Sequence, residues 1–463
     1  MLSTSAQSWP SHIFRAYDIR GLAHTELSTE IVHDVGVIIG SEAREKADKT
    51  VIVARDARLS GRELMEALIK GVRASGCNVI DVGIVPTPLL YFAIHHLNAH
   101  SGIMLTGSHN PPEYNGLKMV VAGQALSEQE IQHIFTRIKS RDFKIGHGHV
   151  SSRDIRADYI AAVLNRVKLS RRLKVVVDAG NGVAGGIAPN LYNALGCEVV
   201  PLYCEMDGMF PNHHPDPSKE KNLRDLIVAV KQHKADIGLA FDGDGDRLGV
   251  VTPQGKIIWP DRQLMLFAKD VLKKRPGATV LFDVKCSKHV SSIVAQYGGV
   301  PIMSKTGHSL IKKKMKEVGA ILAGEMSGHI FFKDNWFGFD DGLFSGARLL
   351  AILAAEDRDA DQVFCDIPES VSTPEINIAV TEQEKFGVIK RLTEGAIFPN
   401  GKIITIDGLR VEFPDGWALI RASNTTPLLV LRFEADNEAS LHRIKTLFAS
   451  YIKQQVPHLA LPF

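Results

Sequence analysis

The chain has 463 residues, of which 45% are hydrophobic and 7% aromatic, and its 54 basic residues nearly balance its 52 acidic ones. This composition is that of an ordinary globular protein, and at roughly 150 residues per domain the length predicts about three domains. The balanced charge leaves no bulk field that would favour a nucleic acid or a membrane surface, so we expect neither as a partner.

Cysteine usage and hydropathy indicate the compartment. The five cysteines are scattered, and none belongs to a Cys-x-x-Cys pair. Such a set argues against a disulfide framework or a zinc site and for a reducing compartment. The longest apolar run, residues 349–355, is far too short to span a bilayer, and no signal peptide is recognisable. We therefore expect a cytoplasmic protein.

The first distinctive segment is residues 14–21, Phe-Arg-Ala-Tyr-Asp-Ile-Arg-Gly. Arginine suits phosphate binding because its planar fork matches two phosphate oxygens. The alternative is that Arg15 or Arg20 pairs with Asp18 and only anchors this part of the chain. Both interpretations remain open from the residues alone.

A pattern of strand, helix, glycine and second strand then occurs three times. Near-continuous apolar strands that alternate with helices predict parallel strand pairing with helices on the faces of the sheet. The copies comprise residues 51–56, 62–74 and 78–82; residues 174–178, 183–195 and 198–203; and residues 279–283, 288–297 and 300–303. The repetition predicts three related α/β domains in series.

A serine loop follows the short apolar run at residues 102–105, with the sequence Thr-Gly-Ser-His-Asn-Pro-Pro at residues 106–112. Gly107 permits backbone angles that other residues avoid, and the two prolines prevent a helix or an inner strand from continuing. We expect a tight loop that presents the Ser108 hydroxyl. Taken alone, the same residues also suit a plain turn.

The loop Gly180-Asn181-Gly182-Val183-Ala184-Gly185 matches the G-x-G-x-x-G pattern between a strand and a helix. Glu205 lies where a dinucleotide-binding fold keeps its ribose carboxylate, so NAD binding is one alternative. The equivalent loops after Asp56 and Asp283 lack these glycines, which favours a role in tight strand-to-helix turning.

The strongest motif is Asp-Gly-Asp-Gly-Asp-Arg at residues 242–247, between two apolar strands. Alternate residues of an extended segment point the same way, so three carboxylates converge. They repel one another unless a cation lies among them, and an all-oxygen ligand set selects Mg²⁺ or a similar ion. An EF-hand is excluded because its sixth and twelfth positions would be Arg247 and Pro253. Arg247 is placed to bind a phosphate that also contacts the ion.

Three later loops are unusually polar. Residues 305–309 precede a helix, so their amides suit an anion, although His308 and Ser309 could instead be helix caps. Residues 324–329 carry Glu325 and Ser327, which suit sugar hydroxyls. Residues 421–427 carry an arginine, hydroxyls and an amide, as in a phosphate cradle. A satisfied turn and a plain hairpin loop are the alternatives for the last two.

The C-terminal part, from residue 369, has a different pattern. A strand at residues 375–380 and a helix at 383–393 precede a meander with two Asp-Gly hairpin turns, and a helix at 438–452 closes the chain. This predicts a small antiparallel α+β domain.

Together these motifs resemble the α-D-phosphohexomutases, most closely the bacterial phosphomannomutase/phosphoglucomutase branch, over the whole chain. The resemblance implies four domains around a central cleft: residues 1–153 with the phosphoserine loop, 154–256 with the metal loop, 257–368 with the sugar-binding loop and 369–463 with the phosphate-binding loop. The family's serine loop usually has Ala at the position of Gly107, so slightly more loop freedom is expected.

The resemblance also implies residue roles. Ser108 would carry the phosphoryl group, and its phosphate would complete a Mg²⁺ site, one per chain, with Asp242, Asp244 and Asp246. Proton transfer and charge stabilisation at the reacting phosphoryl would fall to Arg20, Lys118 and His329. The substrate would be held by Tyr17, Arg247, Lys285, His308, Glu325, Ser327, Arg421, Ser423, Asn424 and Thr425.

The activity implied is interconversion of hexose 1-phosphate and hexose 6-phosphate, for mannose and glucose, through a hexose 1,6-bisphosphate that also serves as activator. The expected partners are small phosphosugars only, and we expect a monomer. The alternatives are a metal-dependent sugar phosphatase, a non-catalytic phosphosugar-binding protein and an NAD enzyme.

Overall fold

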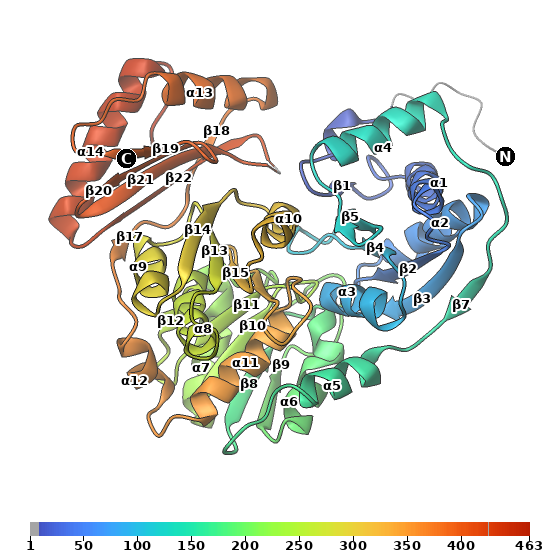
Figure 1. Cartoon of the computed structure of the whole chain (residues 1–463), viewed down its shortest axis with the longest axis horizontal. Helices are drawn as coiled ribbons and strands as arrows, with labels where there is room; N and C mark the ends of the chain where they lie inside the picture. The colour runs from blue at the N-terminus through green and yellow to red at the C-terminus, as the bar shows by residue number, and fades with distance from the viewer. Residues whose placement is uncertain (1–8, 425) are drawn as a thin grey trace. The chain divides into compact units, whose positions relative to one another are not determined.

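The computed structural model describes residues 9–424 and 426–463 (Figure 1). The chain forms two compact units. Unit 1 comprises the residues up to Trp259 together with Ser327–Val363, and unit 2 comprises Pro260–Met326 together with Phe364–Phe463. None of the helices among the described residues combines the length and the apolar character needed to cross a bilayer.

The first sheet of unit 1 has the strand order β1-β5-β4-β2-β3-β7, with β6 beside β5. Its strands are β1 (Ile19–Leu22), β2 (Thr50–Arg55), β3 (Asn78–Ile84), β4 (Ser101–Leu105), β5 (Tyr114–Val121), β6 (Gln124–Ala125) and β7 (Val150–Ser152). The strands β3, β2 and β4 are parallel, as the pattern predicts, but β5 runs antiparallel to β4. The sheet is therefore mixed.

Helices cover both faces of this sheet. They are α1 (Thr29–Glu45), α2 (Gly61–Ala74), α3 (Thr87–His96) and α4 (Gln129–Ser140), after a short 3-10 turn, η1 (Ser11–Ile13). In α2, Leu64, Leu68 and Val72 recur every four residues and are buried, as expected of an amphipathic helix. They join one core with α1, α4 and the strands. A Cβ on Gly102 would meet the Ile94 side chain of α3, so α3 covers the opposite face.

The second sheet repeats this topology, in the order β12-β11-β10-β8-β9. Its strands are β8 (Lys174–Asp178), β9 (Glu198–Leu202), β10 (Ile237–Phe241), β11 (Leu248–Val251) and β12 (Ile257–Ile258). The helical segments are α5 (Arg156–Leu164), η2 (Val183–Gly186), α6 (Ala188–Ala194), η3 (Glu220–Leu223) and α7 (Arg224–His233). The single helix predicted over residues 183–195 is wrong. Pro189 lies in the first turn of α6, where proline is tolerated but cannot continue a preceding helix.

Unit 1 also holds β16 (Ile330–Phe332) and α11 (Gly342–Ala354), and the helix α12 (Ala360–Cys365) follows them in the chain. Unit 2 contains the third copy of the pattern, in which β14, β13 and β15 are parallel neighbours in that order. Its elements are α8 (Pro260–Lys274), β13 (Thr279–Asp283), α9 (Lys288–Gln296), β14 (Val300–Ser304), α10 (His308–Val318) and β15 (Leu322–Gly324). The expectation of three related α/β repeats is confirmed. The exact domain boundaries stay predictions.

The rest of unit 2 is the predicted antiparallel sheet, in the order β17-β22-β21-β20-β19, with β18 also beside β22. Its elements are β17 (Val371–Ser372), β18 (Ile376–Ala379), α13 (Glu382–Glu394), β19 (Lys402–Ile404), β20 (Leu409–Phe413), β21 (Gly416–Ala422), β22 (Leu428–Ala435) and α14 (Glu438–Gln455). Along each strand, every second residue faces the side of the sheet that α13 and α14 cover (Figure 1). Val411 on β20, Ile420 on β21 and Leu431 on β22 belong to the core that the sheet forms with these helices. The opposite face carries Trp417 and Leu419, which pack on Val284.

Candidate functional site

Ser108 lies in the loop between β4 and β5 and is buried. Its hydroxyl Oγ lies 3.1 Å from Oδ2 of Asp242 and 3.2 Å from Nδ1 of His109. The backbone of Ser108 is left-handed, with φ of +49°, which is uncommon for a residue other than glycine. The loop thus directs the serine side chain at the acidic motif, 134 positions later in the chain.

Gly107 does not serve the purpose expected from the sequence. The positive φ belongs to Ser108, whereas Gly107 provides space: a Cβ there would lie 2.5 Å from the guanidinium carbon of Arg58. Extra loop freedom is not what the structure shows, because Arg58 fills the space beside the glycine and hydrogen-bonds to the loop.

The three carboxylates of the acidic motif converge after β10, as predicted. One oxygen each of Asp242, Asp244 and Asp246 lies within 4.8 Å of the others, and all three side chains are buried. Burial, and then the charges of the two neighbouring carboxylates, raise the pKa of Asp242 well above its usual range. Oδ1 of Asp244 is buried and accepts no hydrogen bond from the described residues. A set of hard oxygen donors with excess negative charge fits a divalent cation such as Mg²⁺.

Glycines allow the acidic motif to pack against its neighbours. A Cβ on Gly243 would lie 2.4 Å from the carbonyl oxygen of Ser108, and one on Gly182 would lie 2.8 Å from the carbonyl oxygen of Gly243. The amide of Val183 donates to that same Gly243 oxygen at 3.2 Å. The G-x-G segment is therefore in contact with the metal loop, which supports the turning role and not the dinucleotide alternative.

Lys118, on β5, is the cation closest to the carboxylates. Its ammonium Nζ donates to Oδ2 of Asp244 at 2.7 Å and to Oδ2 of Asp246 at 2.5 Å. Burial alone would lower the pKa of Lys118. The negative charges of Asp244 and Asp246 nevertheless raise this pKa well above its usual range. For Asp246 the signs are reversed. Burial alone would raise its pKa, but Lys118 and His329 hold this pKa well below its usual range.

Two arginines reach the same region, Arg20 from β1 and Arg247 from the loop just before β11. Arg20, on β1, donates to Asp18 Oδ2 at 2.5 Å and to Asn110 Oδ1, in the serine loop, at 2.6 Å. Arg20 therefore forms the ion pair with Asp18 that the sequence offered as an alternative to substrate binding, and it also contacts the serine loop. Arg247 lies with Nε 3.6 Å from Oδ2 of Asp242, and although burial would lower its pKa, Asp242 and other carboxylates raise it.

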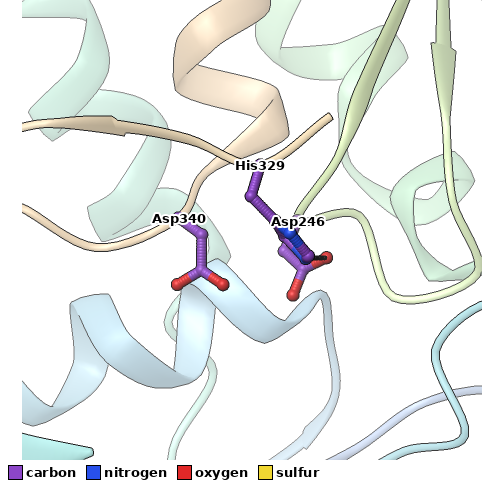
Figure 2. Close-up of side chains that lie close together, drawn as sticks. All are labelled: Asp246, His329 and Asp340. Carbon is purple, nitrogen blue, oxygen red and sulfur yellow. Dashed lines mark ion pairs between the residues drawn. The ribbon is translucent and has the colours of Figure 1, made fainter. Parts of the chain in front are cut away.

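His329 stands beside the acidic motif, within unit 1. Its Nε2 lies 3.3 Å from Oδ1 of Asp246 and accepts from Nε of Arg247 at 3.3 Å. Its other ring nitrogen, Nδ1, lies 2.9 Å from Ser327 Oγ. One ligand atom each of Asp246, His329 and Asp340 lies within 4.8 Å of the others (Figure 2). The sequence did not point to Asp340.

In unit 2, Lys285 follows β13 and His308 begins α10. Lys285 Nζ donates to Oε1 of Glu375 at 2.9 Å. Burial alone would lower the pKa of Lys285, but the charges of Glu375 and Asp283 raise it. Helix α10 has Gly307 at its N-cap with no side-chain cap, so the capping alternative for His308 and Ser309 is wrong. The amide of Gly307 instead donates to Oε1 of Glu325 at 2.5 Å.

The polar loop after β21 also lies in unit 2. Arg421 is buried, and its Nε donates to Oδ2 of Asp407 at 2.9 Å. The same carboxylate oxygen accepts from the amide of Thr306 at 3.0 Å, and Asn424 Nδ2 donates to the Thr306 carbonyl at 3.1 Å. Asp407 thus joins this loop to the one at residues 305–309.

The remaining predicted residues are distributed as follows. Ser423 is buried, and its Oγ is 2.7 Å from Oγ1 of Thr426. Tyr17 is half-buried just before β1. Thr425 lies outside the described residues. In unit 1, Arg20 contacts the serine loop, and Lys118, Arg247 and His329 lie next to the carboxylates. Unit 2 holds further predicted residues: Lys285, His308, Glu325, Arg421, Ser423 and Asn424.

The structure adds residues that the motifs did not indicate. Thr87, the first residue of α3, donates from Oγ1 to Oδ2 of Asp244 at 2.5 Å and from its amide to the Asp244 carbonyl at 2.9 Å. Asp56 and Arg58 contact the serine loop. For Asp56 a signal existed, since it ends the first strand of its repeat as Asp178 and Asp283 do.

Chemically, unit 1 combines a hydroxyl, a set of hard anionic ligands, fixed cations and an imidazole in one buried place. Such a set suits phosphoryl transfer, which depends on positioning and on charge neutralisation.

Comparison with protein-family models gives four consecutive matches. Residues 11–145, 157–255 and 259–371 match alpha/beta/alpha domains I, II and III of phosphoglucomutase/phosphomannomutase, and residues 375–450 match its C-terminal domain.

Individual proteins are similar over the full length. A phosphomannomutase/phosphoglucomutase of Pseudomonas aeruginosa is 56% identical over 463 residues, which cover 100% of both chains. A phosphoglucomutase of Neisseria meningitidis is 52% identical, with 97% of this chain and 98% of the relative covered. The crystal structure of a phosphoglucomutase/phosphomannomutase family protein from Burkholderia thailandensis has a TM-score of 0.94 at 50% identity, with 98% of this chain and 100% of that chain covered.

Proposed function

The chain belongs to the phosphoglucomutase/phosphomannomutase family, and we propose that it interconverts the 1-phosphates and 6-phosphates of glucose and mannose through a phosphoserine at Ser108. The observation that carries this proposal is the 3.1 Å separation of Ser108 Oγ from Oδ2 of Asp242, inside the buried carboxylate set. A hydroxyl in that place can carry a phosphoryl group, because a phosphate there would meet both a bound cation and Arg247.

The residues that would hold the cation are Asp242, Asp244 and Asp246, together with the phosphate on Ser108, and we assign it as one Mg²⁺ per chain. When bound, the ion would neutralise charge on the phosphoryl oxygens.

In the first half-reaction the phosphoryl group passes from Ser108 to the 6-hydroxyl of a hexose 1-phosphate. The bond from phosphorus to Ser108 Oγ breaks and a bond to O6 forms. His329 accepts the proton of the 6-hydroxyl, and Lys118 donates a proton to the departing Ser108 oxygen. The positive charges of Arg20 and Lys118 stabilise the negative charge on the phosphoryl group during its transfer.

In the second half-reaction the hexose 1,6-bisphosphate reverses its orientation. The bond from phosphorus to sugar O1 breaks and a bond to Ser108 Oγ forms. Lys118 takes back the proton of the Ser108 hydroxyl, and His329 gives its proton to O1. The product is hexose 6-phosphate, and the enzyme is again phosphorylated. Bisphosphate supplied in solution would rephosphorylate any enzyme that had lost its phosphate, which is the activator role.

We assign sugar recognition to Glu325 and Ser327, which would bind O3 and O4, with Tyr17, Lys285 and His308 orienting the ring. Because these residues would contact O3 and O4 and not the hydroxyl at C2, the site would accept either configuration at C2 and hence both gluco and manno substrates. The non-reacting phosphate would bind the loop of Arg421, Ser423, Asn424 and Thr425. Arg421 carries its charge beside Asp407, so an arriving phosphate would compete with that carboxylate.

The proposal extends to the setting of the enzyme. We place it in the cytoplasm as a monomer that acts only on small phosphosugars. The dispersed cysteines support a reducing compartment, and the balanced charge argues against nucleic acid or membrane partners.

The test combines mass and turnover. The purified protein should carry one phosphoryl group on Ser108 by intact-mass and peptide analysis, and should convert glucose 1-phosphate and mannose 1-phosphate to the 6-phosphates, with stimulation by glucose 1,6-bisphosphate. Full activity in a Ser108→Ala variant would refute the proposal. Free phosphate released faster than hexose 6-phosphate would instead identify a phosphatase.

A further inference from the structure

Arg58, which lies between β2 and α2, is 1% exposed and directs all of its donors at fixed acceptors. Its Nη2 donates to the carbonyl oxygens of Ser108 at 2.8 Å and Asn110 at 2.6 Å. Its Nη1 donates to the carbonyl oxygen of Tyr114 at 2.9 Å and to that of Pro111. A guanidinium has five N–H groups, and four of them here bind the backbone of one loop, residues 108–114.

The fifth donor connects Arg58 to Asp56. Nε of Arg58 donates to Oδ2 of Asp56 at 3.0 Å, and the carboxylate is 1% exposed. Oδ2 of Asp56 also accepts from Oγ1 of Thr106 at 2.8 Å and from the amide of Gly107 at 3.1 Å. Oγ1 of Thr106 in turn accepts from the amide of Ser108 at 2.8 Å. Both sides of the Ser108 backbone, its amide and its carbonyl, are therefore bound to this pair.

The loop needs such support for two physical reasons. A non-glycine residue in the left-handed region is strained, and Ser108 adopts φ of +49°. In addition, the Ser108 carbonyl lies against Gly243 of the metal loop, where even one added carbon would come within 2.4 Å. A loop free to relax would turn the hydroxyl away from Asp242.

We propose that Asp56, which holds the Ser108 amide through Thr106, and Arg58, which binds the Ser108 carbonyl directly, are positioning residues that set the direction of the phosphoryl-carrying serine. The inference rests on the proposed function of Ser108. The pair touches no substrate. It acts by holding the amide and carbonyl of Ser108, so that Oγ stays within reach of the carboxylate set during both half-reactions. Misplacement of a reacting group by about 1 Å can cost roughly 100-fold in rate.

The experiment uses the full-length chain and the variants Arg58→Lys and Thr106→Val, with Thr106→Ser as the conservative replacement. Lysine keeps the positive charge but cannot bind four carbonyls of one loop. Arg137→Lys is the matched control. Arg137, on α4, is also buried in unit 1 but pairs with Glu45 at the end of α1 and with the Asp142 carbonyl just after α4. For each protein we would measure kcat and KM for glucose 1-phosphate, the rate of Ser108 phosphorylation by glucose 1,6-bisphosphate, and the Tm.

We expect Arg58→Lys and Thr106→Val to lower kcat and the phosphorylation rate by roughly 10- to 100-fold, with KM changed less than about 3-fold. Thr106→Ser should restore both rates, and Arg137→Lys should lower only the Tm. The proposal is overturned if Arg58→Lys and Thr106→Val keep the wild-type kcat, or if Arg137→Lys loses as much kcat at an equal loss of Tm. Absence of both turnover and phosphoserine in the wild type would instead mean that the proposed function itself fails.

Discussion

The carbonyl oxygen of Ser108 lies so close to Gly243 that a Cβ on the glycine would come within 2.4 Å of it. The serine loop and the metal loop are thus in backbone contact, and the spacing between the hydroxyl and the carboxylates depends on a position with no side chain. This contact explains why the acidic motif needs a glycine between its first two aspartates, although Gly243 is not among the residues of positive φ.

A Gly243→Ala variant should therefore lose activity without losing the fold. The added methyl group must displace the Ser108 carbonyl by several tenths of an ångström or more, so we expect kcat to fall by roughly 100-fold. Steady-state kinetics of the variant gives the measurement. Gly387→Ala is the control, because a Cβ there meets nothing within 4 Å. Equal kcat in the two variants would show that the contact does not matter.

Lys118 should stabilise the metal-free protein by neutralising Asp244 and Asp246. Removing one partner of a buried ion pair typically costs about 3–5 kcal/mol, so Lys118→Met should lower the free energy of unfolding in EDTA by that order. Added Mg²⁺ should recover part of the loss, since the ion supplies positive charge to the same carboxylates. Chemical denaturation with EDTA and with Mg²⁺ measures both effects.

The control for Lys118 is Lys174→Met. The Lys174 side chain pairs with Glu198 at 3.0 Å but is 32% exposed, so its loss should cost no more than about 1 kcal/mol. A Lys118 variant as stable in EDTA as this control would contradict the neutralising role.

Asp341 should make the stability of unit 1 depend on pH. This buried carboxylate caps α11 and accepts from Tyr159 Oη at 2.8 Å and from Trp336 Nε1 at 3.1 Å. Burial raises the pKa of Asp341 to about 7, from an ordinary value of 3.8 for an aspartate. The folded state therefore holds a proton that the unfolded state has released, and stability falls as pH rises from near 4 to near 7.

The expected slope from this one group is up to about 1.4 kcal/mol per pH unit within that window, with no further loss above it. Urea denaturation from about pH 5 to pH 8 should show the decline in the wild type and a flatter profile in Asp341→Asn. Identical profiles would rule Asp341 out as the source.

Arg421 should affect substrate binding more than turnover. If it binds the non-reacting phosphate, Arg421→Gln removes a charge-assisted hydrogen bond worth about 1.5–3 kcal/mol and should raise KM for glucose 1-phosphate by roughly 10- to 100-fold. Arg443→Gln, which loses an exposed pair with Asp415 and a cation–π contact with Phe413, should leave KM unchanged. A large fall in kcat with an unchanged KM would place Arg421 in the chemistry instead.

Local pattern was sufficient for the elements and their order. The strand at Lys174–Asp178, the helix at Lys288–Gln296 and the hairpin strands around Gly416 follow from hydrophobic periodicity and turn residues within a few positions. The repeat of strand, helix, glycine and strand also predicted the shared topology of the α/β sheets. The apolar strand that became β11 was predicted, but the antiparallel direction of β5 and β11 was not, because strand direction depends on connections that periodicity does not describe.

The sequence by itself determined the chemistry available: a serine loop, three alternating carboxylates, and polar loops whose order along the chain identifies the family. Only the tertiary structure decided which groups meet. Ser108 and Asp242 are 134 positions apart, and Arg58 reaches a loop about 50 positions away. Such contacts, and the burial that raises the pKa of Asp242, are properties of packing between distant segments, so no local pattern encodes them. For the same reason, only the structure shows that the glycine at position 107 leaves room for the Arg58 side chain and does not provide backbone freedom.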